Sequence, residues 1–238
     1  MTRAPRDAST VIVARDGRAG IEVYMLRRSS QSPAVPDAYV FPGGTLDDND
    51  RSPQARMRLV GQWRPAEPAF TYAAIRETFE ECGLLFSVTP IPAERLRDAR
   101  TKMLEGGRSF AETLIDLDAR LDARAVRYFS RWITPTVVPH RFDARFFVSR
   151  APAGQQAEAD ALETYDGKWI RPLDALESAG RDEMQLIFPT LKHLERVAQF
   201  ASVDALLTFA DTKKTIPVTP DVREGPSFLL PPTLENTW

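Results

Sequence analysis

The feature that most constrains this chain is the run RETFEECG at positions 76–83, which follows the mostly apolar stretch FTYAAI. On a helix with about 100° between successive residues, Glu77, Glu80 and Glu81 lie within one face about 100° wide. Three carboxylates on one side leave the other side of this segment to make the contacts that fold the chain. The segment therefore predicts a helix with one strongly acidic face.

The opposite face of the same helix is apolar. Ile75, Phe79 and Cys82 fall almost directly across the wheel from the three glutamates, which is the pattern of a helix packed by one side. Gly83 favours an end to the helix, because glycine readily adopts the left-handed conformation just past a C-terminus. We expect a helix over about 70–82, with Cys82 as a small buried hydrophobe rather than a nucleophile.

Carboxylates three and four residues apart on a helix repel each other, and the repulsion grows where water is excluded. A hard divalent cation such as Mg²⁺ or Mn²⁺ relieves that repulsion, since such ions prefer oxygen ligands and bridge carboxylates to phosphates. The alternative is a solvated acidic face neutralised by nearby lysine and arginine side chains. The helix alone leaves both interpretations open.

The surrounding residues favour the metal site. FPGG at 41–44 precedes the acidic helix, and the segment from Arg76 to Leu84 carries Arg, three Glu, Gly and an aliphatic residue at fixed spacing. This pattern resembles the Nudix family, whose box is GX5EX7REUXEEXGU, where U is aliphatic. Thr78 stands at a position that is usually more apolar.

The first half of the box departs from the family pattern. Counting from Gly44, the residue at the family's first glutamate is Asp50, and 25 residues separate Asp50 from Arg76 where the family has seven. The family's first glutamate chiefly supports the arginine, so Asp50 either takes that part with a shorter reach or leaves it unfilled. The second half of the box, which carries the metal ligands, is intact.

The resemblance implies a set of roles. It makes Glu77, Glu80 and Glu81 ligands of Mg²⁺ or Mn²⁺, with a backbone carbonyl at Gly44 or its neighbour completing the shell. It pairs Arg76 with one of the glutamates. It implies metal-dependent hydrolysis of a diphosphate bond in a small nucleotide-like substrate, without a covalent enzyme intermediate.

A general base and phosphate contacts must come from elsewhere in the chain. Family members take the base from the box helix or from a later loop, and Glu163 is our first loop prediction, with Glu158 and Asp160 as substitutes. A solvated loop carboxylate is the alternative for Glu163. Arg141 and Arg28 are predicted to contact substrate phosphate, although a structural ion pair, such as Arg141 with Asp143, explains an arginine at that position equally well.

Composition narrows the possible partners. The 31 basic and 33 acidic residues leave a formal charge of −2, which gives no field that would attract a nucleic-acid backbone. One cysteine excludes an internal disulfide framework and a cysteine-rich zinc site. No apolar run approaches the length of a membrane helix, and the N-terminal residues lack the apolar core of a secretory signal. We therefore expect no nucleic-acid or membrane partner and a cytoplasmic location; the sequence does not indicate an oligomeric state.

The rest of the chain predicts a mixed α/β fold. STVIVA and IEVYMLRR read as a hairpin, regular structure is expected to break at Pro42-Gly43-Gly44, and strands are expected around 142–149 and 168–170. Helices are predicted at PLDALESAG and from Pro189 to about Phe200. By resemblance, the fold is a Nudix α/β/α sandwich in a single domain over 1–238, with insertions at about 51–68 and a helical region at 93–129.

Three further segments resemble a Nudix subgroup that includes peroxisomal coenzyme A diphosphatases. They are WITPTVVPHRFDARFF, Glu163 six residues before Trp169, and LIFPT at 186–190. The resemblance makes coenzyme A or an acyl derivative the leading substrate, although LRRS at 26–29 only echoes an upstream segment of those enzymes. ADP-ribose or another nucleoside diphosphate derivative is the alternative substrate. A nucleotide sensor without turnover is an alternative of another class, but such a protein is expected to lose box glutamates, and this chain keeps all three.

Overall fold

The structure is a computed structural model that describes residues 4–32, 35–61, 68–160, 162–222, 227–234 and 238. It opens with the predicted hairpin, formed by β1 (Arg6–Gly17) and β2 (Gly20–Arg28). The two strands pair only close to their turn, from Gly17 and Gly20 to Ala14 and Val23. Beyond these residues β1 and β2 diverge, and each has an inner edge open for another strand.

Two short strands fill the fork between β1 and β2. β3 (Tyr39–Val40) pairs with β2, and β4 (Gly43–Thr45) pairs with β1, both antiparallel. The chain crosses from one arm of the fork to the other at Pro42, whose carbonyl accepts a hydrogen bond from Val11 N at 2.8 Å. The expectation that regular structure breaks at 42–44 is therefore wrong for Gly43 and Gly44, because the open edge of β1 supplies partners for their backbone.

Four more strands complete a mixed sheet. β8 (Phe142–Arg150) lies parallel to β1 along nine residue pairs, and β7 (Val126–Ile133) is antiparallel to β8. β10 (Pro217–Val218) runs parallel to β7 at one edge, and β9 (Thr164–Ile170) is antiparallel to β2 at the other. The sheet order is β10-β7-β8-β1-β2-β3, with β4 attached to β1 and β9 to β2.

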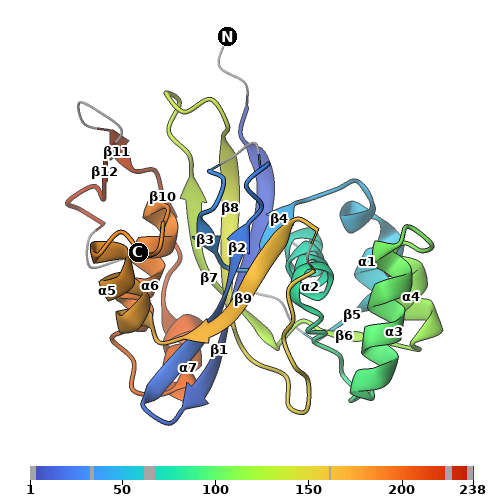
Figure 1. Cartoon of the computed structure of the whole chain (residues 1–238). Helices are drawn as coiled ribbons and strands as arrows, with labels where there is room; N and C mark the ends of the chain where they lie inside the picture. The colour runs from blue at the N-terminus through green and yellow to red at the C-terminus, as the bar shows by residue number, and fades with distance from the viewer. Residues whose placement is uncertain (1–3, 33–34, 62–67, 161, 223–226, 235–237) are drawn as a thin grey trace.

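The helices divide between the two faces of this sheet (Figure 1). On one face lie the elements from the middle of the chain, and on the other face lie the C-terminal helices. The first group is η1 (Asn49–Arg51), α1 (Pro53–Arg58), α2 (Pro68–Cys82), α3 (Ala93–Leu104) and α4 (Phe110–Asp116), with the paired strands β5 (Leu59–Val60) and β6 (Leu121–Asp122). The second group is α5 (Pro172–Gly180), α6 (Phe188–Val197) and α7 (Val203–Thr212), and β11 (Asp221–Val222) and β12 (Phe228–Leu229) form a separate ribbon.

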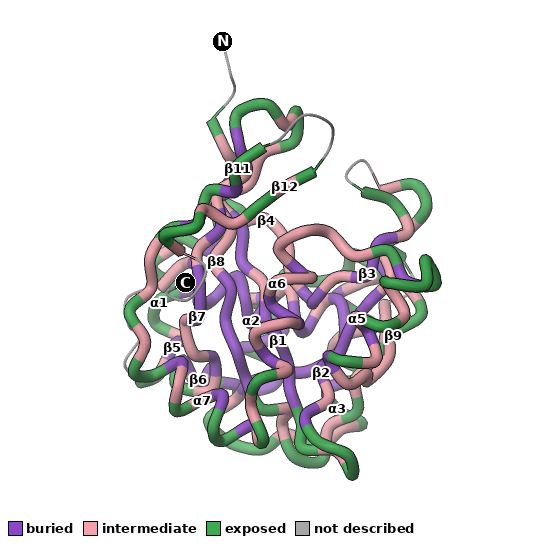
Figure 2. Tube along the Cα trace, turned by 90° about the vertical axis from the view of Figure 1, so that its left-hand side faces the viewer, coloured by how far each residue is buried: buried purple, intermediate pink, exposed green. Residues whose placement is uncertain are grey.

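Alternating side chains of the central strands build two apolar cores. Val11 and Val13 of β1 pack into the cluster that holds α2, whereas Ile12 and Ala14 pack into the cluster that holds α6 and α7. This alternation follows from the two-residue period of a strand that is covered on both faces. The central strands are accordingly the most buried part of the trace (Figure 2). The predicted α/β/α sandwich with a mixed sheet is confirmed.

Several local predictions are confirmed and two are corrected. The helices predicted at 70–82, at PLDALESAG and from Pro189 onward are present, although the last ends at Val197. The helical region predicted for 93–129 stops at Asp116, because 126–129 form the start of β7 and pair with β8. Helix α7 was not predicted. Part of the predicted 51–68 insertion, 62–67, lies outside the described residues.

No helix in the described part of the chain is both long and apolar enough to cross a membrane. The prediction of a single domain over 1–238 remains a prediction.

His193 lies at the centre of the second core. It is fully buried, with its ring stacked on Phe146 at 4.1 Å between centroids. Its Nδ1 lies 2.6 Å from the carbonyl of Pro189, which can only accept, so Nδ1 carries the proton and Nε2 accepts from the Ser130 hydroxyl at 2.6 Å. Burial lowers the pKa of His193 to about 3. The ring is a satisfied, neutral core residue.

This environment predicts a pH-dependent loss of stability. Between pH 6.5 and about 3, His193 is protonated in the unfolded chain but neutral in the folded protein. The free energy of unfolding therefore falls as the pH drops from 6.5 toward 3. The slope from this residue reaches at most about 1.4 kcal/mol per pH unit. Urea unfolding of the wild type and of His193→Gln between pH 4 and 7 should show a shallower decline in the variant. Parallel curves would contradict the prediction.

Candidate active site

The box helix α2 has the two-faced form that its sequence predicts. Ile75, Phe79 and Cys82 are fully buried in the first core, and Gly83 ends the helix with a φ of +74°. Thr78 is also fully buried, and its hydroxyl donates to the carbonyl of Ala74 at 2.7 Å. That hydrogen bond allows a threonine at a position that usually carries an apolar residue.

Cys82 is no nucleophile in this environment. Its thiol is buried and donates to the carbonyl of Thr78 at 2.9 Å. Burial raises the pKa of Cys82 to about 12, so the thiolate is not populated near neutral pH. The prediction of a small buried hydrophobe at this position is confirmed.

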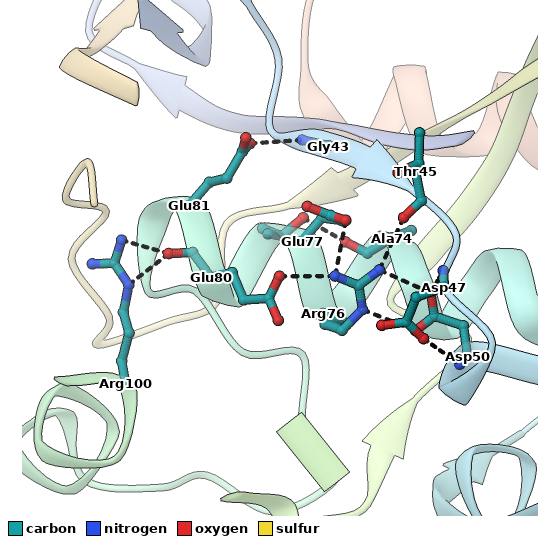
Figure 3. A network of polar contacts seen from close by, with 11 residues as sticks. Gly43, Thr45, Asp47, Asp50, Ala74, Arg76, Glu77, Glu80, Glu81 and Arg100 are labelled. Atoms are coloured by element: carbon teal, nitrogen blue, oxygen red, sulfur yellow. Dashed lines mark hydrogen bonds and ion pairs between the residues drawn. The ribbon is translucent and has the colours of Figure 1, made fainter. Parts of the chain in front are cut away.

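Arg76 organises the acidic side of the helix (Figure 3). Its Nε and Nη2 donate to the two carboxylate oxygens of Asp50 at 2.9 and 2.8 Å, which is a bidentate pair. Its Nη1 lies 2.8 Å from a carboxylate oxygen of Glu77 and 2.8 Å from one of Glu80. Nη2 also donates to the carbonyl of Thr45 at 3.1 Å. One guanidinium therefore joins the box helix to β4 and η1.

Asp50 fills the position left open in the first half of the box. Its side chain is fully buried against Arg76. Asp50 accepts a hydrogen bond from Asp47 N at 2.9 Å, and its own N–H donates to the Asp47 carboxylate at 3.0 Å. These reciprocal bonds fix the turn that carries Asp50 close enough to Arg76 for a side chain one methylene shorter than glutamate. The long excursion between the two halves of the box leaves their contact intact.

Gly43 and Gly44, which we call the glycine corner, lie in the fork of the sheet against two of the box glutamates, Glu81 and Glu77. Gly43 N donates to the Glu81 carboxylate at 2.8 Å. A Cβ on Gly43 would stand 2.4 Å from the carbonyl oxygen of Ser9, so only glycine fits so close to β1. A Cβ on Gly44 would stand 2.5 Å from the carboxylate of Glu77. The backbone of this corner thus lies directly against the box carboxylates.

The site holds more buried negative charge than Arg76 neutralises. Burial raises the pKa of Glu77 to about 7 although Arg76 opposes the shift, and burial also raises the pKa of Glu80. Burial and the nearby Glu77 raise the pKa of Glu81 well above its usual range. Burial opposes the charge on Arg76, but its bonds to Asp50 and the two glutamates raise its pKa overall. A divalent cation is the kind of ligand that would allow all three glutamates to ionise together.

The side chains of Glu77, Glu80 and Glu81 do not converge on one point as the ligands of a metal ion would. Within the described residues, no three histidine, cysteine or acidic side chains converge as ligands for one ion. Glu77 and Glu80 turn toward Arg76 and Glu81 toward Gly43, as Figure 3 shows. The donor set fits a hard cation by its chemistry, because it consists of carboxylate and backbone oxygens. The assignment of Glu77, Glu80, Glu81 and Gly44 as metal ligands stays a prediction.

The loop base predicted from the sequence lies near the same acidic face. Glu163 immediately precedes β9, and the negative charges of Glu163 and Asp160 both contribute to the raised pKa of Glu81. The Glu163 side chain is exposed and makes no hydrogen bond or ion pair to the described residues. Its carboxylate is therefore available to a water or a substrate, and its role as general base stays a prediction.

The two arginines predicted to contact substrate have local partners. The Arg28 guanidinium donates to Ser32 Oγ at 2.7 and 3.0 Å, at the end of β2 next to Glu163. Arg141 donates from Nε to the carbonyl of Thr134 at 3.1 Å, and Asp143 pairs with Arg131 and Arg145. Neither contact tests substrate binding, so both assignments stay predictions.

The sequence analysis did not predict the contacts that two further residues, Arg100 and Asp160, make at the site. Arg100 of α3 donates from Nε and Nη2 to the carbonyl of Glu80 at 3.0 and 2.8 Å, which satisfies a backbone acceptor near the end of α2. Asp160 binds the backbone of the loop that carries Glu163. The Arg100 contact joins two helices that only the fold brings together. The Asp160 contact is local, between residues two to four positions apart.

A family model matches more than half of this chain. The family model described as the NUDT19 Nudix domain matches residues 54–197, which include the whole acidic helix and the loop with Glu163. This chain belongs to that Nudix family.

Two relatives are each 27% identical to this chain over the aligned residues. "Acyl-coenzyme A diphosphatase NUDT19" of Xenopus laevis is 27% identical over 79% of this chain and 62% of its own length. The protein of that name in Gallus gallus is 27% identical over 95% of this chain and 78% of its own length. This chain thus spans less than two thirds of the first of these relatives.

A solved structure supports the same placement. The crystal structure of a Nudix hydrolase from Alicyclobacillus acidocaldarius superposes with a TM-score of 0.75 at 27% identity, covering 87% of this chain and 97% of that one. The mixed sheet and the helices on its two faces are therefore shared with a Nudix hydrolase of known structure.

Asp50→Ala tests the anchor of Arg76. The substitution leaves the guanidinium buried without its bidentate partner, so the free energy of unfolding should fall by about 3 kcal/mol or more, the usual result of removing one partner of a buried pair. Chemical denaturation measures the change. Asp48→Ala is the matched control, because Asp48 is exposed and two residues away. Equal stability of the two variants would contradict the anchoring role.

The pKa of Glu77 predicts how the metal-free protein responds to pH. Between pH 4.5 and about 7 the folded protein holds a proton on Glu77 that the unfolded chain has lost, so the free energy of unfolding decreases as the pH rises through this window. Added Mn²⁺ should therefore raise the melting temperature more at pH 8 than at pH 5.5, when compared with a chelator. In Glu77→Gln the pH dependence of this shift should be reduced. An identical Mn²⁺ shift at both pH values in both proteins would contradict the prediction.

Proposed function

We propose that this chain hydrolyses a diphosphate linkage in a nucleotide-like substrate with Mg²⁺ or Mn²⁺, and that coenzyme A or an acyl derivative of it is that substrate. The observation that carries the proposal is the acidic face of α2, on which Arg76 and Asp50 fix glutamates that hold excess negative charge. The substrate rests on relatives that are named acyl-coenzyme A diphosphatases. Their names alone support this choice over ADP-ribose.

In this proposal Glu77, Glu80 and Glu81 would hold the divalent ion, with the Gly44 carbonyl as a further ligand. A bound ion of this kind neutralises diphosphate oxygens and makes a nearby water more acidic. Arg76 does not touch the substrate; it holds the side chains of Glu77 and Glu80 through Nη1. These ion pairs restrict the side chains of Glu77 and Glu80 to the acidic face, and both carboxylates would turn from Arg76 toward a bound ion.

Glu163 acts as the general base. Its exposed carboxylate takes one proton from a water whose oxygen forms a bond to one phosphorus of the diphosphate. The bond from that phosphorus to the bridging oxygen breaks, and the bridging oxygen leaves on the other phosphate. Each half of the substrate therefore departs with a terminal phosphate, and no covalent enzyme intermediate forms.

The experiment that tests the proposal is a substrate panel. Coenzyme A, an acyl-coenzyme A, ADP-ribose, NADH, a dinucleoside polyphosphate and a nucleoside triphosphate are each incubated with Mg²⁺, Mn²⁺ or a chelator, and the products are resolved by chromatography. We expect metal-dependent release of two phosphate-terminated halves from the coenzyme A compounds. Faster turnover of ADP-ribose would show that ADP-ribose, and not coenzyme A, is the substrate. Binding of a compound without its turnover would identify the protein as a sensor.

Three substitutions separate the proposed roles. Glu80→Gln and Glu81→Gln should abolish activity with the fold intact, because each removes a charged ligand. Glu163→Gln should lower kcat by about 10²-fold or more, the usual effect of losing a general base. Circular dichroism controls for folding. Near-wild-type rates in both helix variants would show that the metal site lies elsewhere, and a change below about threefold in Glu163→Gln would exclude it as the base.

A further inference from the structure

The segment between β8 and β9 is tied to the C-terminal end of the box helix. The Gln155 side chain accepts from Leu85 N at 2.8 Å and donates to Leu85 O at 3.0 Å, so it binds one residue's backbone on both sides. Glu158 N donates to the carbonyl of Cys82 at 3.0 Å. These three bonds join residues about 70 positions apart, and they fix the start of the loop directly on the helix that carries the glutamates.

Asp160 fixes the other end of the same loop. One oxygen of its carboxylate, Oδ1, accepts hydrogen bonds from the backbone N–H groups of Leu162, Glu163 and Thr164 at 2.9, 3.2 and 3.0 Å. The Thr164 hydroxyl donates to the same oxygen at 3.2 Å. Ser29 N then donates to the carbonyl of Glu163 at 2.9 Å. The backbone of Glu163 is therefore held on both its N–H and its carbonyl side.

The two neighbouring acids have opposite environments. Asp160 directs one oxygen at four donors of the turn, so its carboxylate is tied to the backbone. The Glu163 carboxylate has no hydrogen bond to the described residues, although its backbone is fixed. A fixed backbone beneath a free carboxylate limits where that carboxylate can reach.

We propose that Asp160 is a positioning residue: by fixing the backbone of Glu163, it holds the Glu163 carboxylate within reach of the water that attacks the substrate. This role rests on the proposed function, in which Glu163 is the base. It replaces the sequence-based prediction that Asp160 could serve as a substitute base. The physical reason is that a general base must stand within hydrogen-bond reach of its water, and a shift of about 1 Å can cost about 10²-fold in rate.

Two variants of Asp160 separate its hydrogen bonding from its charge. Asp160→Ala removes the acceptor, and we expect kcat to fall by about 10-fold to 10²-fold with little change in KM. Asp160→Asn keeps a carbonyl oxygen that can accept the same bonds, and its amide nitrogen replaces an oxygen for which the described residues provide no bond. This variant should retain most of the wild-type kcat. Gln156→Ala, an exposed position of the same loop, is the matched control.

A double mutant tests whether Asp160 acts through Glu163. If it does, Asp160→Ala combined with Glu163→Gln should be no slower than Glu163→Gln alone, within about twofold. Hydrogen exchange of the amides at 162–164 gives a readout without substrate: protection should be lost in Asp160→Ala and restored in Asp160→Asn. A purely structural role would not produce non-additive kcat values together with an unchanged KM.

The outcomes distinguish this role from the proposed function. Absence of turnover by the wild type on the whole panel would overturn both. Wild-type turnover with an unchanged kcat in Asp160→Ala, or with additive losses in the double mutant, would overturn the positioning role alone. Unchanged amide protection in Asp160→Ala would also overturn it. A loss of kcat that Asp160→Asn restores, with no further loss in the double mutant, supports it.

Discussion

The contact between Arg76 and Asp50 is the constraint on which the rest of the site depends. A buried guanidinium must have its donors satisfied, and here they reach η1, β4 and two glutamates of its own helix. The pair therefore sets the position of α2 relative to the fork in the sheet as well as the side-chain directions of Glu77 and Glu80. Because both partners are buried, loss of either leaves an uncompensated charge inside the protein.

The divergence of β1 and β2 provides the space that this arrangement needs. A fully paired hairpin would use the inner edges that β3 and β4 occupy, and the glycine corner would have no place beside α2. In the observed fold the corner presents a backbone N–H to Glu81 and lies against Glu77. Backbone groups from the sheet and carboxylates from one helix thus face the same space, while the loop from β8 to β9 brings Glu163 near it.

Much of the fold could be predicted from sequence patterns that repeat every two to four residues. The acidic helix, the first hairpin and the two-faced strand at 142–149 were predictable because neighbours along the chain determine which side chains share a face. The errors arose where partners are distant. Residues 126–129 are a strand because β8 lies beside them, and Gly43 and Gly44 join the sheet because β1 leaves an edge open. Local propensity contains neither fact.

The sequence by itself determined the chemistry of the acidic face, since Glu77, Glu80, Glu81 and Arg76 share one helix and their relative placement follows from helical geometry. It did not determine whether Asp50 reaches Arg76 across 25 intervening residues, or that the loop from β8 to β9 is tied through Gln155 and Glu158 to the end of the box helix. The tertiary structure decided both, because the two contacts depend on where loops begin and end in space. Periodicity specifies the faces of an element, whereas the distance between elements depends on the packing of the whole chain.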